Sequence, residues 1–165
     1  MSKFRETQEE NDLFHSLSSK TEEVIDGPLV EGWFDGAVEP KNPGGHGAYG
    51  ALVKVESEVV YAHGDYIGVG PTISNNVAEF SGFIDALRHA LEYPGPIIVR
   101  GDSKLVLFTL TGQYKVHGGL YVPFYEKARA LYQPHRERIR LEWIPREENS
   151  ECDKLSKDVL HDRGV

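Results

Sequence analysis

The chain has 165 residues and a mass of 18.5 kDa, which suffices for one domain with a buried core and is too short for two of ordinary size. Its 39% of hydrophobic residues form no run that could span a bilayer, and MSKFRETQEEND at the amino terminus predicts no signal peptide. A net charge of −8 argues against coating of nucleic acid by bulk electrostatics, although a local basic patch stays open. The single cysteine, Cys152, cannot form an internal disulfide, so we expect a cytoplasmic protein.

The first 28 residues differ in composition from the rest of the chain. Residues 1–28 are polar and acidic and end in Gly27-Pro28, which predicts a loosely attached arm, with room for one short helix, ahead of a single domain over residues 29–165. That domain begins with three predicted strands, the second and third alternating as an antiparallel pair: LVEGWFDG at 29–36, GALVKVE at 50–56 and EVVYAHGDY at 58–66.

The period of the apolar residues changes after Asn75. Apolar side chains then recur every three or four positions, at Val77, Phe80, Ile84, Leu87 and Leu91, which predicts an amphipathic helix that Tyr93-Pro94-Gly95 ends. A buried strand, two helices, a fifth strand and a terminal helix are predicted at 96–102, 103–112, 121–132, 138–145 and 150–162. The order β-β-β-α-β-α-α-β-α predicts an α/β fold with a mixed five-stranded sheet flanked by helices.

A glycine pattern in this sequence resembles a nucleotide-binding loop. Residues 45–50 spell GxGxxG, but a dinucleotide-binding loop needs this pattern directly after a strand and at the start of a helix. Here two prolines separate it from the preceding strand and it continues into a predicted strand, and the chain lacks both kinase and P-loop signatures. We therefore interpret these glycines as positions where the strand passes close to a neighbour.

Four acidic residues lie where predicted elements meet. Asp35 and Asp102 each end an apolar strand, Glu79 lies in the predicted first turn of its helix, and Asp153 lies in the first turn of the terminal helix. Ordinary interpretations exist, because Glu79 and Asp153 could complement helix dipoles and Asp102 could cap the next helix. They do not explain why two strands and two helices each direct an acid toward one place.

Clustered carboxylates repel one another unless cations lie between them. Oxygen-only ligation suits Mg²⁺ or Mn²⁺, and two such ions about 4 Å apart activate water and stabilise the leaving oxygen in phosphodiester cleavage. No other site in the sequence is comparable, since the seven histidines lack zinc-binding spacing, no GxSxG motif occurs, and Cys152 suits a core better than a nucleophilic site.

Four segments resemble, in order, the active-site blocks of type 1 ribonuclease H: WFDGAVEPKNPGGHGAYGALV, TISNNVAEFSGFIDAL, IIVRGDSKLVLFTLTG and LEWIPREENSECDKLSKDVL. The resemblance covers roughly residues 29–162 and implies a ribonuclease H fold in a monomer. It implies cleavage of the RNA strand of RNA–DNA hybrids by two Mg²⁺ ions, for which Mn²⁺ substitutes, leaving 5′-phosphate and 3′-hydroxyl ends. Some relatives of the archaeal type also cut duplex RNA.

The resemblance assigns roles to individual residues. The metal-binding acids are matched by Asp35, Glu79, Asp102 and Asp153. Substrate contacts are matched by the backbone amide of Gly36, by Asn42 of an NPG turn, by Ser74 toward a DNA phosphate, and by Asn75 and Asn76 toward the minor groove. An enzyme that cuts only RNA must sense 2′-hydroxyls, which lie in that groove and suit carboxamide partners. Asn75 has the alternative role of capping its helix.

Three features depart from the bacterial form of the family. Its catalytic-loop histidine is missing, and IPREEN resembles the archaeal-type branch, so Arg146 is the candidate for a phosphate or leaving-group role, with a solvated surface arginine as the alternative. Lys104 replaces a frequent glutamine, which favours a phosphate contact. The lysine-rich substrate handle is replaced by QYKVHGGLYVPFYEKAR, whose aromatic residues either stack on DNA or face the core: Tyr121, Phe124 and Tyr125.

Other classes of function fit the sequence less well. A non-catalytic ribonuclease H-like module that binds nucleic acid would have no need of all four acids. Another nuclease on the same fold would show different acid spacings and no SNNxxE. A protein that binds small phosphorylated ligands would need a convincing glycine loop.

Overall fold

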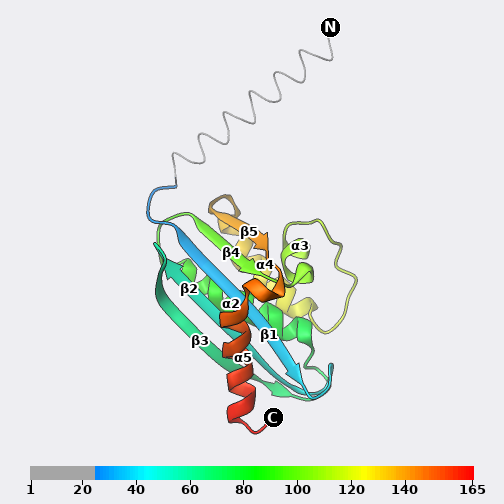
Figure 1. Cartoon of the computed structure of the whole chain (residues 1–165). Helices are drawn as coiled ribbons and strands as arrows, with labels where there is room; N and C mark the ends of the chain where they lie inside the picture. Colours follow the sequence, from blue (N-terminus) through cyan, green and yellow to red (C-terminus); the bar gives the residue numbers. More distant parts are fainter. Residues whose placement is uncertain (1–24) are drawn as a thin grey trace.

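The computed structural model describes residues 25–165, in which five strands form one mixed sheet in the order β3-β2-β1-β4-β5 (Figure 1). The first three strands are antiparallel neighbours, namely β1 (Val30–Glu39), β2 (His46–Val55) and β3 (Glu58–Val69). Two shorter strands continue the sheet in parallel beside β1, namely β4 (Ile97–Gly101) and β5 (Ile139–Trp143). The predicted fold class and strand count are confirmed. Of the predicted arm, residues 1–24 lie outside the described part of the chain.

Helices cover both faces of this sheet. One face carries three helices that pack against one another, namely α2 (Asn75–Ala90), α3 (Lys104–Leu110) and α4 (Val122–Tyr132). The opposite face carries α5 (Ser150–Asp162), which Figure 1 shows in front of the sheet while α2 lies behind it. Two short 3-10 helices complete the chain order, η1 (Gln133–Arg138) and η2 (Arg146–Glu148). Within residues 25–165, no helix has the length and apolar character needed to cross a membrane.

The core lies between the sheet and α2. Phe34 of β1 is fully buried and meets Phe83 of α2 edge to face, with ring centroids 5.5 Å apart. The predicted apolar stripe of α2 faces this core, with Val77, Phe80 and Leu87 buried. Burial of each such side chain contributes about 1.5–3 kcal/mol to folding stability. The packing of α2 on β1 therefore fixes the positions of the side chains that these two elements carry.

The first strand is longer than its sequence predicts. Its apolar run ends at Asp35, where we expected the strand to stop, but pairing with β2 continues to Glu39 opposite His46. Pairing with β4 ends earlier, at Trp33 opposite Arg100. Asp35 is therefore not at a strand end but just beyond the last β1–β4 pair. β4 itself ends at Gly101, one residue after this last pair, and Asp102 follows directly.

Glycines allow both helix layers to approach the sheet closely. A Cβ on Gly36 of β1 would lie 2.5 Å from the amide nitrogen of Glu79, so α2 can pack here only against glycine. On the other face, a Cβ on Gly50 of β2 would overlap the carbonyl oxygen of Cys152 in α5. Gly50 ends the GxGxxG pattern, and the pattern runs into β2 as predicted. Its glycines serve close packing of a strand, as the sequence indicated.

Candidate active site

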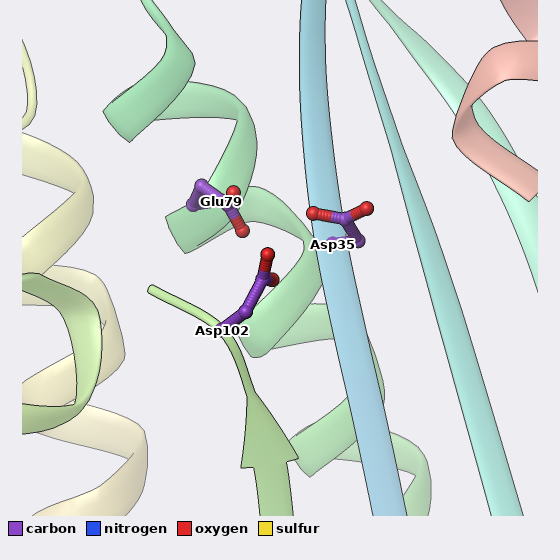
Figure 2. A group of neighbouring side chains, drawn as sticks. All are labelled: Asp35, Glu79 and Asp102. Carbon is purple, nitrogen blue, oxygen red and sulfur yellow. The ribbon is translucent and has the colours of Figure 1, made fainter. Parts of the chain in front are cut away.

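Three carboxylates converge beside β1 (Figure 2). Figure 2 shows Asp35 on β1, Glu79 on α2 and Asp102 directly after β4, with their carboxylates directed toward one another. Each offers an oxygen within 4.8 Å of the oxygens of the other two. Asp35 and Glu79 are only 5% exposed, whereas Asp102 is partly exposed. Segments far apart in the sequence thus bring three acids together, two of them buried.

The cluster is electrostatically strained. Burial, with the nearby carboxylates of Asp102 and Asp153, raises the pKa of Asp35 from 3.8 to about 7, against a hydrogen bond of 2.9 Å from the Gly36 amide. Burial, with the charges of Asp35 and Asp102, raises the pKa of Glu79 well above its ordinary value. Among the described residues, Oε2 of Glu79 has no hydrogen-bond partner. A buried all-oxygen donor set with an unsatisfied atom fits a hard divalent cation.

Asp153 stands beside this cluster with a different environment. It lies in the first turn of α5 and lines the same cavity as the three acids. Its Oδ1 is 3.8 Å from Nη2 of Arg146 and its Oδ2 is 3.2 Å from Nζ of Lys157. The fourth predicted acid is therefore held between two cations while its negative charge still reaches Asp35.

The helix caps correct three of the ordinary interpretations. The N-cap of α2 is Ser74, whose hydroxyl accepts from the Val77 amide at 3.2 Å, and the N-cap of α3 is Ser103, which accepts from Val106 at 3.3 Å. Capping by Asn75 and by Asp102 was therefore the wrong interpretation. Glu79 is the fifth residue of α2 and not in its first turn, so dipole compensation does not explain it either. Serines serve as caps here, which leaves the carboxylates for the site.

A cavity of about 210 Å³ holds the acids and several predicted substrate residues. Gly36, Asn75 and Arg146 line it together with the four acids. Asn42 is not part of this lining, but its Oδ1 accepts from the backbone amide of Asn75 at 2.9 Å, which places Asn42 beside the start of α2. The cavity lining does not include Ser74, Asn76 or Lys104.

The contacts of Lys104 and of the tyrosine-rich segment show what each of them packs against. Nζ of Lys104 lies 4.9 Å from the ring centre of Trp143, and the indole of Trp143 donates to the carbonyl oxygen of Asp102 at 3.2 Å. Tyr121 is buried and stacks on Phe80 with ring centroids 5.7 Å apart. The other two aromatic residues considered, Phe124 and Tyr125, pack partly buried against the core. The core-facing interpretation of these three rings is the correct one.

Two site residues escaped the sequence interpretation. Asn149 is 2% exposed and donates both to Oδ1 of Asp102 at 3.2 Å and to the carbonyl oxygen of Phe34 at 2.8 Å. Lys157 lines the cavity and pairs with Asp153. Both stand four positions from Asp153, one helical turn before and one after. Helical spacing around an acid already assigned to the site could have found Lys157. The role of Asn149 could not be found from this spacing, because it depends on how the chain enters α5.

The fold and the site define a class of protein. A sheet of three antiparallel and two parallel strands, with acids on β1, on α2, after β4 and on α5, is the architecture of ribonuclease H-like proteins. The sequence matches the reverse transcriptase-like family over residues 33–159, most of the chain. The chain belongs to this family and, as its similarity to solved ribonuclease H structures shows, to its type 1 ribonuclease H members.

Solved structures support this assignment. Ribonuclease H1 of the archaeon Halobacterium salinarum NRC-1 is 30% identical with a TM-score of 0.70, over 81% of this chain and 98% of that one. The N-terminal ribonuclease H domain of Rv2228c from Mycobacterium tuberculosis is 34% identical with a TM-score of 0.71, over 82% and 95%. LC11-RNase H1, at 23% identity, has a TM-score of 0.72 over 82% and 99%, and supports the fold.

The mycobacterial relative is longer than this chain. Full-length Rv2228c carries the name bifunctional protein and is 35% identical over 120 residues. Those residues are 72% of this chain and 32% of Rv2228c, so the similarity spans about a third of that relative. The shared part is its ribonuclease H domain.

Proposed function

We propose that the chain is an endoribonuclease that cleaves the RNA strand of RNA–DNA hybrids, acting as a monomer in the cytoplasm with Mg²⁺, for which Mn²⁺ can substitute. The convergence of Asp35, Glu79 and Asp102 within 4.8 Å, in a type 1 ribonuclease H chain, carries this proposal. LC11-RNase H1, which shares the fold, has been crystallised with an RNA/DNA hybrid. Hybrid is therefore the first substrate to test.

The acids would hold the cations that this chemistry requires. Two divalent ions held by Asp35, Glu79, Asp102 and Asp153 would neutralise the phosphate, activate a water and stabilise the leaving oxygen. Asp35 and Glu79 supply buried oxygens from rigid elements, and Asp102 is kept in orientation by Asn149. Hydrolysis would leave 5′-phosphate and 3′-hydroxyl ends.

Selection of RNA would depend on the start of α2 and the backbone of β1. Asn75 lines the cavity and its amide is held by Asn42, so its carboxamide and that of Asn76 would meet 2′-hydroxyls in the minor groove. Gly36 lines the cavity, and its amide, which donates to Oδ1 of Asp35 in the free protein, would bind the cleaved strand once a cation engages that carboxylate. The Ser74 hydroxyl accepts from Val77 and would donate its hydrogen to a DNA phosphate.

Two cationic side chains would contact phosphates outside the carboxylate cluster. Arg146 has a 70% exposed side chain and reaches Asp153 at 3.8 Å, so it can move to the leaving group or an adjacent phosphate. Lys104, exposed on the first turn of α3, would bind a phosphate beside Trp143.

A cleavage assay tests the proposal. The protein is incubated with Mg²⁺ or Mn²⁺ and end-labelled RNA–DNA hybrid, duplex RNA, duplex DNA and single strands. We expect internal cuts in the RNA of the hybrid, loss of cutting in Asp102→Asn, and no cutting when the metal is chelated. Asp102→Asn is a suitable control because an asparagine still offers Asn149 an acceptor oxygen.

The outcomes separate the alternatives. A folded protein that cuts no substrate, with either metal, would refute the enzyme proposal, and hybrid binding without cutting would support a non-catalytic module. Cuts in duplex RNA would extend the substrate range. Cuts in duplex DNA, or removal of single nucleotides from an end, would indicate another nuclease on the same fold.

A further inference from the structure

Lys157 lies at the site, but metal binding by the four acids gives it no role. It lies on α5 one turn after Asp153, and its Nζ is 3.2 Å from Oδ2 of Asp153. Its side chain is 45% exposed and lines the same cavity as the carboxylates. The lining also includes β1 from Asp35 to Glu39, which forms a path along β1 that leads away from the acids, and Lys157 lines the same cavity as this path.

Both cationic side chains of this cavity depend on the same carboxylate for their ion pair. Of the described residues that line the cavity, the cationic ones are Arg146 and Lys157, and each pairs with a different oxygen of Asp153. A cation bound by Asp153 would compete for those oxygens. Lys157 would then lose its partner inside a cavity that must accept a polyanionic strand, and an ammonium on a flexible stem binds phosphate well as a point charge.

We propose that Lys157 binds a backbone phosphate of the cleaved strand, adjacent to the phosphate at the carboxylates. This rests on the proposed function, because the path along β1 holds that strand only if the acids hold its scissile phosphate. Lys157 pairs with Asp153 before substrate arrives and transfers to the phosphate when Asp153 engages its cation. It therefore contributes to affinity for the strand and keeps Asp153 near the cluster in the free protein.

A second lysine on the same helix provides a matched control. Lys154 pairs with Asp158 at 2.6 Å, has a 76% exposed side chain, and is not among the residues that line the cavity. It carries the same charge, one turn of helix away. An effect of net charge alone would appear equally at Lys154 and at Lys157.

The first experiment measures binding of hybrid without cleavage. Lys157→Gln, Lys157→Arg and Lys154→Gln are each placed in the Asp102→Asn background, and binding of labelled RNA–DNA hybrid is followed by fluorescence anisotropy over a series of KCl concentrations with Mg²⁺. We expect Lys157→Gln to bind several-fold more weakly, with a salt slope shallower by about 0.7–0.9, as for one lost phosphate contact. Lys157→Arg should keep most of the affinity, and Lys154→Gln should change neither quantity.

The second experiment measures Mg²⁺ binding in proteins with all four acids, without nucleic acid, by calorimetric titration. Lys157→Gln should bind Mg²⁺ at least as tightly as the wild type, because a cation beside Asp153 has been removed. A loss of hybrid affinity then cannot come from a lost metal. Weaker Mg²⁺ binding in Lys157→Gln would instead indicate a structural role and overturn the inference.

The remaining outcomes separate this inference from the proposed function. If the wild type cuts hybrid while Lys157→Gln keeps its affinity and salt slope, only the inference is overturned. An equal loss in Lys154→Gln also overturns it. If the wild type binds hybrid but does not cut it, the proposed function is overturned, and a selective loss in Lys157→Gln would still support the phosphate contact.

Discussion

The side-chain amide of Asn149 connects the Asp102 carboxylate to the backbone of β1. It donates to Oδ1 of Asp102 at 3.2 Å and to the carbonyl oxygen of Phe34 at 2.8 Å. The backbone carbonyl oxygen of Asn149 in turn accepts from the backbone amide of Asp153 at 3.1 Å. Because Phe34 directly precedes Asp35, one buried residue ties together the segments that carry three of the four acids.

Replacement of Asn149 by alanine should damage both the site and the fold. The carbonyl of Phe34 would lose a buried partner, which costs about 1–3 kcal/mol of unfolding free energy. Asp102 would lose its orienting donor, so Mg²⁺ affinity or activity should fall about 10–100-fold, as for residues that support metal ligands. Urea denaturation and Mg²⁺ titration measure the two effects. Loss of stability with unchanged Mg²⁺ affinity would show that Asn149 does not position Asp102.

The carboxylate cluster should make the stability of the metal-free protein depend on pH. The pKa of Asp35 is raised from 3.8 to about 7, so between these values the folded state holds a proton that the unfolded state releases. The contribution of Asp35 to the unfolding free energy is therefore most favourable below about pH 4. It falls by up to roughly 4 kcal/mol as the pH rises to about 7. Glu79 acts in the same direction.

The variant Asp35→Asn isolates this effect from the titration of other carboxylates. The difference in unfolding free energy between Asp35→Asn and wild type, measured with a chelator present, should move in favour of the variant from pH 4 to pH 7 and then level off. Mg²⁺ should reduce the difference, because a bound cation favours the ionised carboxylates. A difference independent of pH would contradict the raised pKa.

Glu79→Gln should stabilise the metal-free protein at pH 8. The change removes a charge that is 5% exposed and repelled by two neighbouring carboxylates, so an increase of about 1–2 kcal/mol is expected. The same variant should lose cleavage and most of the rise in melting temperature that Mg²⁺ gives the wild type. Calorimetry with and without Mg²⁺ checks the two expectations on stability, and the cleavage assay checks the loss of activity. A less stable Glu79→Gln protein would show that Glu79 serves the fold.

Much of this site followed from the sequence because its acids interrupt regular apolar patterns. Asp35 ends an apolar run, Asp102 follows a buried strand and Glu79 lies beside a helical stripe, so element order and the resemblance placed them together. Asn149 could not be found in this way. Its role depends on a buried contact with Phe34, 115 positions earlier in the chain, which no local pattern records.

The boundaries of elements were harder to predict than their order. The apolar run of β1 ends at Asp35, but backbone pairing with β2 continues to Glu39, since strand pairing does not require apolar side chains. Helix starts depended on which of two neighbouring polar residues caps. Asn75 and Asp102 were plausible caps by type, and the serines at 74 and 103 take that role. Local propensity favours all four residues at a cap, and tertiary packing selects one.

The close approach of α2 to β1 should tolerate no side chain at Gly36. A Cβ there would lie 2.5 Å from the Glu79 amide nitrogen and 2.6 Å from the carbonyl carbon of Ala78. These are backbone atoms that cannot rotate away, so Gly36→Ala should force α2 off β1. We expect a loss of at least about 3 kcal/mol of unfolding free energy, the upper end for overpacked cores.

Gly32, on the same strand and the same face, is the matched control. A Cβ there would meet Val99 at 3.7 Å and Ala86 at 3.9 Å, which are ordinary van der Waals distances, so Gly32→Ala should be near neutral. Urea denaturation of both variants compares one added methyl group at two places on β1. Because α2 carries Glu79, Gly36→Ala should also weaken Mg²⁺ binding, whereas Gly32→Ala should leave it unchanged. Equal stability of the two variants would contradict the view that the contact of α2 with β1 at Gly36 sets the position of Glu79.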